Sequence, residues 1–61
     1  MPPNIIHLED NPDILNATEF IFLNDNVNLI QVSSLVAFQK ALEAHKFILA
    51  ILDGKFPNTD G

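Results

Sequence analysis

The 61-residue sequence contains no cysteine and no arginine, and each absence removes a class of function. Without cysteine, disulfide bonds and thiolate metal sites are excluded. Three lysines stand against eight acidic residues, which gives a net charge of −5. Nucleic acid is therefore not expected as a direct partner, because phosphate contacts need clustered positive charge. The same acidity argues against binding to an anionic membrane surface.

Long apolar runs are also missing. No stretch approaches the roughly 18 apolar residues that a transmembrane helix requires. The start of the chain, Met1–Asn4, lacks the basic and apolar regions of a secretory signal. We therefore expect a cytoplasmic chain without a membrane partner. The hydrophobic content of 48% is too high for a disordered chain. A domain this small nevertheless generally needs disulfides, a structural metal or a partner to be stable.

Apolar segments alternate with helical patterns along the chain. The pattern predicts three strands and two helices, in the order strand 5–8, helix 12–23, strand 27–32, helix 35–45 and strand 47–52. Asn11 followed by Pro12 is typical of a helix start, and Ser33 or Ser34 can cap the second helix. Nearly continuous apolar strands that alternate with helices indicate an α/β fold, with a parallel sheet covered on both faces.

Acidic residues follow two of the predicted strands. Glu9 and Asp10 come directly after the first strand, and Asp53 comes directly after the third. If these strands are neighbours, their carboxyl ends meet at one edge of the sheet, where ligands bind in open parallel sheets. Three carboxylates so close together demand a cation, and Mg²⁺ is the natural choice for oxygen ligands. Acids at strand ends can also be simple helix caps, and His7 is more simply a core histidine than a metal ligand.

Two segments resemble the receiver domains of bacterial response regulators. The segment Ile5–Pro12 (IIHLEDNP) is similar to their first strand and acidic pair, and Leu52–Gly61 (LDGKFPNTDG) is similar to their phosphoacceptor loop, with Pro57 four residues after the aspartate. The interval of 43 residues between Asp10 and Asp53 also matches this family. The resemblance covers nearly the whole chain.

The resemblance implies a role for each acidic residue. Asp53 would accept the phosphoryl group, and Asp10 would bind Mg²⁺ directly. Glu9 would assist, and the main-chain carbonyl of Lys55 would complete the protein ligands of the metal. The phosphoryl donor would be a sensor histidine kinase or a phosphotransfer protein, so the chain would take part in a two-component phosphorelay without being an enzyme itself.

The fold that the resemblance implies is flavodoxin-like, with the first three parallel strands in the order 2-1-3. Residues 1–61 would then form the N-terminal part of a receiver domain. The threonine or serine and the lysine that the family places after its fourth and fifth strands have no counterpart in this sequence. The third strand would also lie at the edge of the sheet. An exposed apolar strand edge is a template for pairing, so we expect a homodimer, or association with a second half, through that strand.

Two other functions remain open on the residues alone. The chain could be a truncated module that no longer switches and acts through dimerisation or another protein interaction. It could also be a phosphohydrolase with an aspartyl nucleophile, although such enzymes typically need a second aspartate two residues after the first. That position is Lys55 in this sequence.

Overall fold

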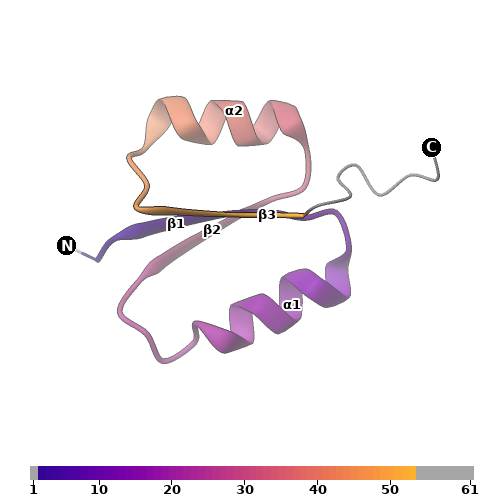
Figure 1. Cartoon of the computed structure of the whole chain (residues 1–61), viewed down its shortest axis with the longest axis vertical. Helices are drawn as coiled ribbons and strands as arrows, with labels where there is room; N and C mark the ends of the chain where they lie inside the picture. Colours follow the sequence, from indigo (N-terminus) through magenta and orange to yellow (C-terminus); the bar gives the residue numbers. More distant parts are fainter. Residues whose placement is uncertain (1, 54–61) are drawn as a thin grey trace.

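The computed structural model describes residues 2–53 and shows two helices and three strands (Figure 1). In chain order these are β1 (Asn4–Leu8), α1 (Pro12–Ile21), β2 (Asn28–Val32), α2 (Leu35–Ala44) and β3 (Leu49–Leu52). The alternation predicted from the sequence is confirmed. The third strand is shorter than predicted, because the chain bends at Ile48 before β3 begins.

The three strands form one parallel sheet in the order β2-β1-β3. The central strand is β1, in which Ile6 lies opposite Ile30 of β2 and Ala50 of β3. The two helices lie on opposite faces of the sheet (Figure 1), as right-handed crossovers require when the strand order reverses after the second strand. The predicted α/β class and the strand order 2-1-3 are therefore confirmed.

Both helices begin at the capping residues that the sequence suggested. The side chain of Asn11 accepts a hydrogen bond from the Asp13 N–H at 2.9 Å, and Ser34 Oγ accepts one from the Ala37 N–H at 3.1 Å. Each bond satisfies a backbone donor that the first turn of a helix leaves without a partner. Helix α1 ends at Ile21, two residues before the predicted end, with Phe22 as its cap. Neither helix is long and apolar enough to span a membrane.

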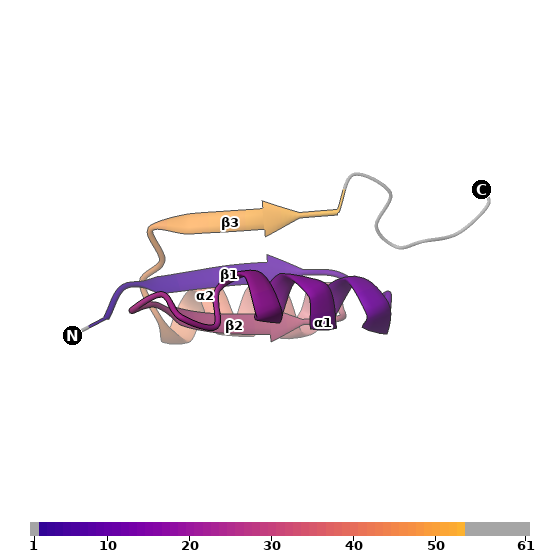
Figure 2. The same ribbon diagram turned by 90° about the horizontal axis from the view of Figure 1, so that it is seen from below.

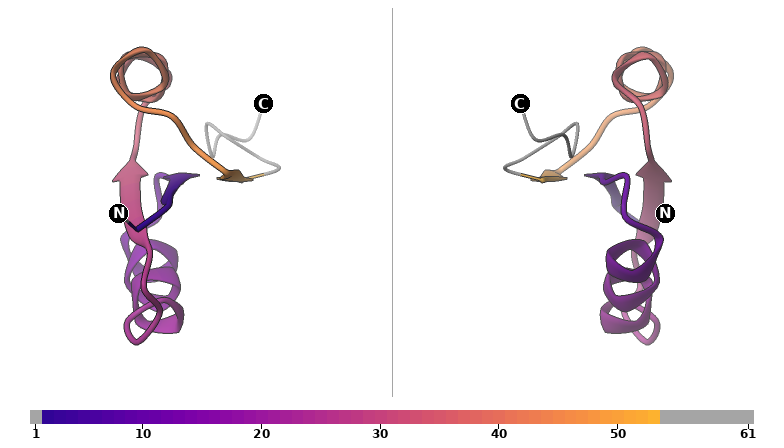
Figure 3. Two further views of the ribbon diagram at one scale, coloured as in Figure 1. Left: turned by 90° about the vertical axis from the view of Figure 1, so that its left-hand side faces the viewer. Right: turned by 90° about the vertical axis from the view of Figure 1, so that its right-hand side faces the viewer.

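The core is centred on β1, the strand with a neighbour on each side. Ile5, Ile6 and Leu8 are buried, with Ile6 fully inaccessible to solvent. The expectation that helices cover the whole sheet is wrong for β3. Figures 2 and 3 show β3 standing clear of both helices, and its residues Leu49, Ala50 and Leu52 are exposed. The chain between residues 2 and 53 therefore buries one strand well and one strand poorly.

A polar side-chain network ties α1 to the sheet. Gln31 of β2 donates from Nε2 to the main-chain oxygen of Leu15 at 2.8 Å, and the same nitrogen lies 3.2 Å from Nδ1 of His7. His7 is buried, with only 2% of its surface exposed. It is therefore a hydrogen-bonded core histidine, which agrees with the simpler of the two sequence interpretations. Buried polar groups need such partners, because an unsatisfied group is costly.

The Gln31 network leads to a prediction about stability. Replacing Gln31 by alanine removes the donor to Leu15 and leaves His7 without its amide partner. We expect the free energy of unfolding to fall by about 1–3 kcal/mol, the usual cost of leaving buried polar groups unsatisfied. Urea denaturation measures this change. The control is Gln39→Ala on the exposed surface of α2, which should shift stability by less than about 0.5 kcal/mol; equal effects of the two variants would contradict the network.

Candidate metal centre

The carboxyl ends of β1 and β3 bring three acidic residues together. Leu8 is the last residue of β1 and lies opposite Leu52, the last residue of β3. The ladder continues one step further, because the Asp53 N–H donates to the Leu8 oxygen at 3.2 Å. On the other side of β1, the Glu9 N–H donates to the Val32 oxygen at 3.0 Å. The residues that follow both strands are therefore held in place by the sheet.

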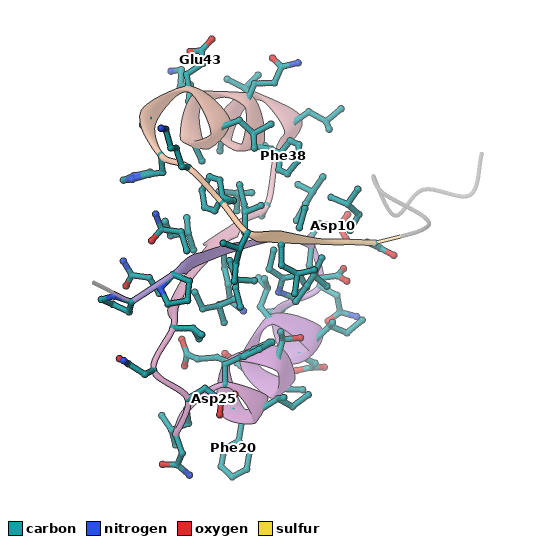
Figure 4. The ribbon with its side chains drawn as sticks, turned by 60° about the vertical axis from the view of Figure 1, so that its left-hand side comes forward. Asp10, Phe20, Asp25, Phe38 and Glu43 are labelled. Carbon is teal, nitrogen blue, oxygen red and sulfur yellow. The ribbon has the colours of Figure 1, made fainter. Side chains whose placement is uncertain are left out.

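Glu9, Asp10 and Asp53 form an acidic cluster at this edge. Each contributes one carboxylate oxygen, and these three oxygens lie within 4.8 Å of one another. Glu9 is buried, with 4% of its surface exposed, whereas Asp10 and Asp53 are partly exposed. Figure 4 shows Asp10 at the end of the sheet where β3 finishes. The structure thus brings together the carboxylates of Glu9 and Asp10, which follow β1, and of Asp53, which follows β3.

Two main-chain amides orient the buried carboxylate of Glu9. Its Oε2 atom accepts hydrogen bonds from the Asp10 N–H and the Asn11 N–H, each at 3.1 Å. Charge-assisted hydrogen bonds of this kind fix the orientation of a carboxylate. The side chain of Glu9 is therefore held in one orientation by its two amide contacts.

The donor set suits a hard divalent cation. All three side chains offer carboxylate oxygens, which Mg²⁺ prefers, and their separation leaves room for a cation among them. One or two direct carboxylate ligands with several waters is the usual arrangement for Mg²⁺. Three like charges this close also repel one another unless a cation or protons balance them. Glu9, Asp10 and Asp53 are thus the residues that could hold the metal, and Lys55, which the resemblance adds, lies outside the described residues.

One feature of the centre was not foreseen from the sequence, namely the double hydrogen bond to Glu9. The amides that Glu9 accepts from belong to Asp10 and Asn11, in the connection before α1, and no sequence pattern marks this contact. No pocket is found among residues 2–53. His7, the other residue weighed as a ligand, does not join the cluster.

The geometry predicts how a change at Glu9 affects metal binding. In Glu9→Gln the side-chain oxygen can still accept from Asp10 and Asn11, but one negative charge is lost. We expect Mg²⁺ affinity to fall by about 10- to 100-fold, as is typical when a residue that supports a metal ligand is changed. Isothermal titration calorimetry measures the affinity. Glu43→Gln, on the face of α2 that points away from the sheet (Figure 4), carries the same charge change and should leave affinity unaltered.

Comparison of the chain with protein-family models, with curated proteins and with solved structures gave no match in any of the three.

Proposed function

We propose that this chain is the N-terminal part of a receiver domain and accepts a phosphoryl group on Asp53, with Mg²⁺ bound by Glu9, Asp10 and Asp53. The proposal rests on one observation above the others. Residues 43 positions apart in the sequence place their carboxylates within 4.8 Å at the carboxyl end of a parallel sheet. The segments that resemble the receiver family supply these same residues.

Asp53 is the best placed of the three carboxylates to act as the nucleophile. Glu9 is buried, and its Oε2 is engaged by two amides. Asp10 follows Glu9 directly in the sequence and lies in the connection between β1 and α1. Asp53 follows the edge strand β3 and is partly exposed, so a donor can approach it from the open side of the sheet. Its carboxylate oxygen would bond to phosphorus as the bond from phosphorus to the donor nitrogen breaks, which leaves an acyl phosphate.

The other residues of the centre hold charge and geometry. Glu9 fixes the connection between β1 and α1 through its two amide contacts, and Asp10 presents its carboxylate beside Asp53. Bound Mg²⁺ would neutralise charge on the transferring phosphoryl oxygens. The donor we propose is a sensor histidine kinase or a phosphotransfer protein, and the proposed location is the cytoplasm. In this role the chain is a phosphorylated signalling component and not an enzyme.

The direct test is incubation of the chain with acetyl phosphate and Mg²⁺, followed by intact mass spectrometry. We expect a mass increase of one phosphoryl group that disappears when EDTA replaces Mg²⁺. If circular dichroism shows that the protein is folded and still no adduct forms, the phosphoacceptor proposal is wrong. That result would favour the alternative of a non-switching interaction module. Catalytic turnover of an aryl phosphate would instead favour a phosphohydrolase.

A further inference from the structure

We propose that the outer edge of β3 binds a second copy of this chain, with the two β3 strands antiparallel about a twofold axis. The proposal concerns an interaction surface and is independent of phosphoryl transfer. It starts from the exposure of β3, whose residues Leu49 and Leu52 have 49% and 59% of their surface exposed. Ile48, just before the strand, is 70% exposed. Figures 2 and 3 show that neither helix lies over this strand.

The backbone of β3 presents hydrogen-bonding groups to its outer side. The Asp53 N–H points to β1, where it donates to the Leu8 oxygen. Successive residues of a strand direct their backbone groups to alternate sides, so within β3 the N–H and C=O of Ala50 and Leu52 point away from β1. An edge strand with such groups and without a charged residue is a template for strand addition. Residues 49–52 read Leu-Ala-Ile-Leu and contain no charge.

A second copy fits this edge because the strand is complementary to itself. With Ala50 on the twofold axis, the two Ala50 residues exchange their outward N–H and C=O groups. Leu49 then lies opposite Ile51 of the second copy. Ile48 lies before the strand and its N–H donates to the Asn4 oxygen of β1, so the paired residues are 49–51. Every one of these cross-strand neighbours is apolar, and such pairs stabilise sheets. A shift of the pairing by one residue would place outward groups against inward ones. A shift by two would put Leu49 against the charged Asp53 in one direction, and Leu52 against the charged Lys46 in the other.

Charge selects the antiparallel arrangement over the parallel one. His45 and Lys46 precede the amino end of β3, whereas Glu9, Asp10 and Asp53 gather at its carboxyl end. Antiparallel pairing places the amino end of one strand beside the carboxyl end of the other. Lys46 of each copy then lies next to the acidic cluster of the other. This pairing of opposite charges offsets the repulsion between two chains that each carry a net charge of −5. Parallel pairing would instead bring like charges together.

The arrangement also has the closed symmetry that is typical of homodimers. A twofold axis uses the same edge of both copies, so the two β3 edges cover each other and no further copy can add to them. The two sheets become one sheet of twice as many strands, with β2 of each copy at its outer edges. Each β3 then becomes an interior strand with a neighbour on both sides.

The first experiment measures the oligomeric state of the 61-residue chain over a range of concentrations by sedimentation equilibrium. We expect a species of twice the 6.8 kDa chain mass. Ala50→Pro should prevent its formation, because proline removes an outward N–H while leaving the bonds between β3 and β1 intact. Ile51→Pro is the matched comparison: its N–H points to β1, so this variant should disrupt the fold itself.

A second variant decides the question if Ala50→Pro fails to fold. Lys46→Glu reverses the charge that faces the acidic cluster of the other copy, and two such contacts change in a symmetric dimer. We expect the dimer dissociation constant to rise roughly tenfold. Lys40→Glu on the exposed surface of α2 carries the same charge change and should have no such effect. A monomer at all concentrations, or a dimer equally affected by Lys46→Glu and Lys40→Glu, would overturn the proposal.

Discussion

We expect the replacement of Asp53 by asparagine to abolish the phosphoryl adduct that we propose the unaltered chain forms with acetyl phosphate and Mg²⁺. The amide of asparagine is nearly the same size as the carboxylate, so the backbone contact between the Asp53 N–H and the Leu8 oxygen is retained. What is lost is the nucleophilic oxygen and one of three negative charges in the cluster. The expected change is from a measurable adduct to none, since an amide is a far weaker nucleophile than a carboxylate.

The control for this variant is Asp25→Asn in the exposed loop after α1. It removes one acidic group from the chain without touching the cluster, and it should keep the full adduct. Intact mass spectrometry of the three proteins, prepared and treated together, gives the comparison. An adduct that persists in Asp53→Asn would place the phosphoryl group elsewhere and would contradict the assignment of Asp53.

We expect the replacement of Ile6 by alanine to unfold most of the chain population. Ile6 is fully buried at the centre of β1, between Ile30 and Ala50 on the neighbouring strands. Removing a buried isoleucine side chain to the β-carbon costs about 2–5 kcal/mol. A chain of 61 residues has a total stability of only about 3–9 kcal/mol at the usual value per residue. The loss is therefore comparable to the whole free energy of folding.

The matched control is Ile21→Ala at the end of α1, where the side chain is 69% exposed. This variant should stay within about 0.5 kcal/mol of the unaltered chain. Far-UV circular dichroism with urea denaturation, at one protein concentration, measures both variants. If Ile6→Ala were as stable as Ile21→Ala, the core could not be centred on β1.

The order of the elements could be predicted because local signals in this chain are strong. Asn11 and Pro12 mark the start of α1, and the side-chain bond of Asn11 to the Asp13 N–H is the contact that such a pair predicts. The apolar run of β1 is buried as expected. Glu9 and Asp10 follow one parallel strand and Asp53 follows another. They were therefore expected to meet if the two strands were neighbours, and β1 and β3 are neighbours.

The resemblance placed the third strand at the edge of the sheet, but the composition of the strand could not show that neither helix covers it. The run from Phe47 to Leu52 is more apolar than β1, yet Leu49 and Leu52 are exposed. Burial depends on the helices, and these lie over β1 and β2 on the two faces of the sheet. The double hydrogen bond to Glu9 was missed for a similar reason: it depends on the path of the chain between β1 and α1.

The measurement that tests the metal centre most directly is an NMR titration of the chain with Mg²⁺. Binding at the cluster predicts saturable shifts of the Glu9, Asp10, Asn11 and Asp53 amides, because these residues surround the three carboxylates. The amides of residues 24–26, around the exposed Asp25, should remain unchanged. Shifts that fail to saturate, or that centre on residues 24–26, would contradict a metal site formed by Glu9, Asp10 and Asp53.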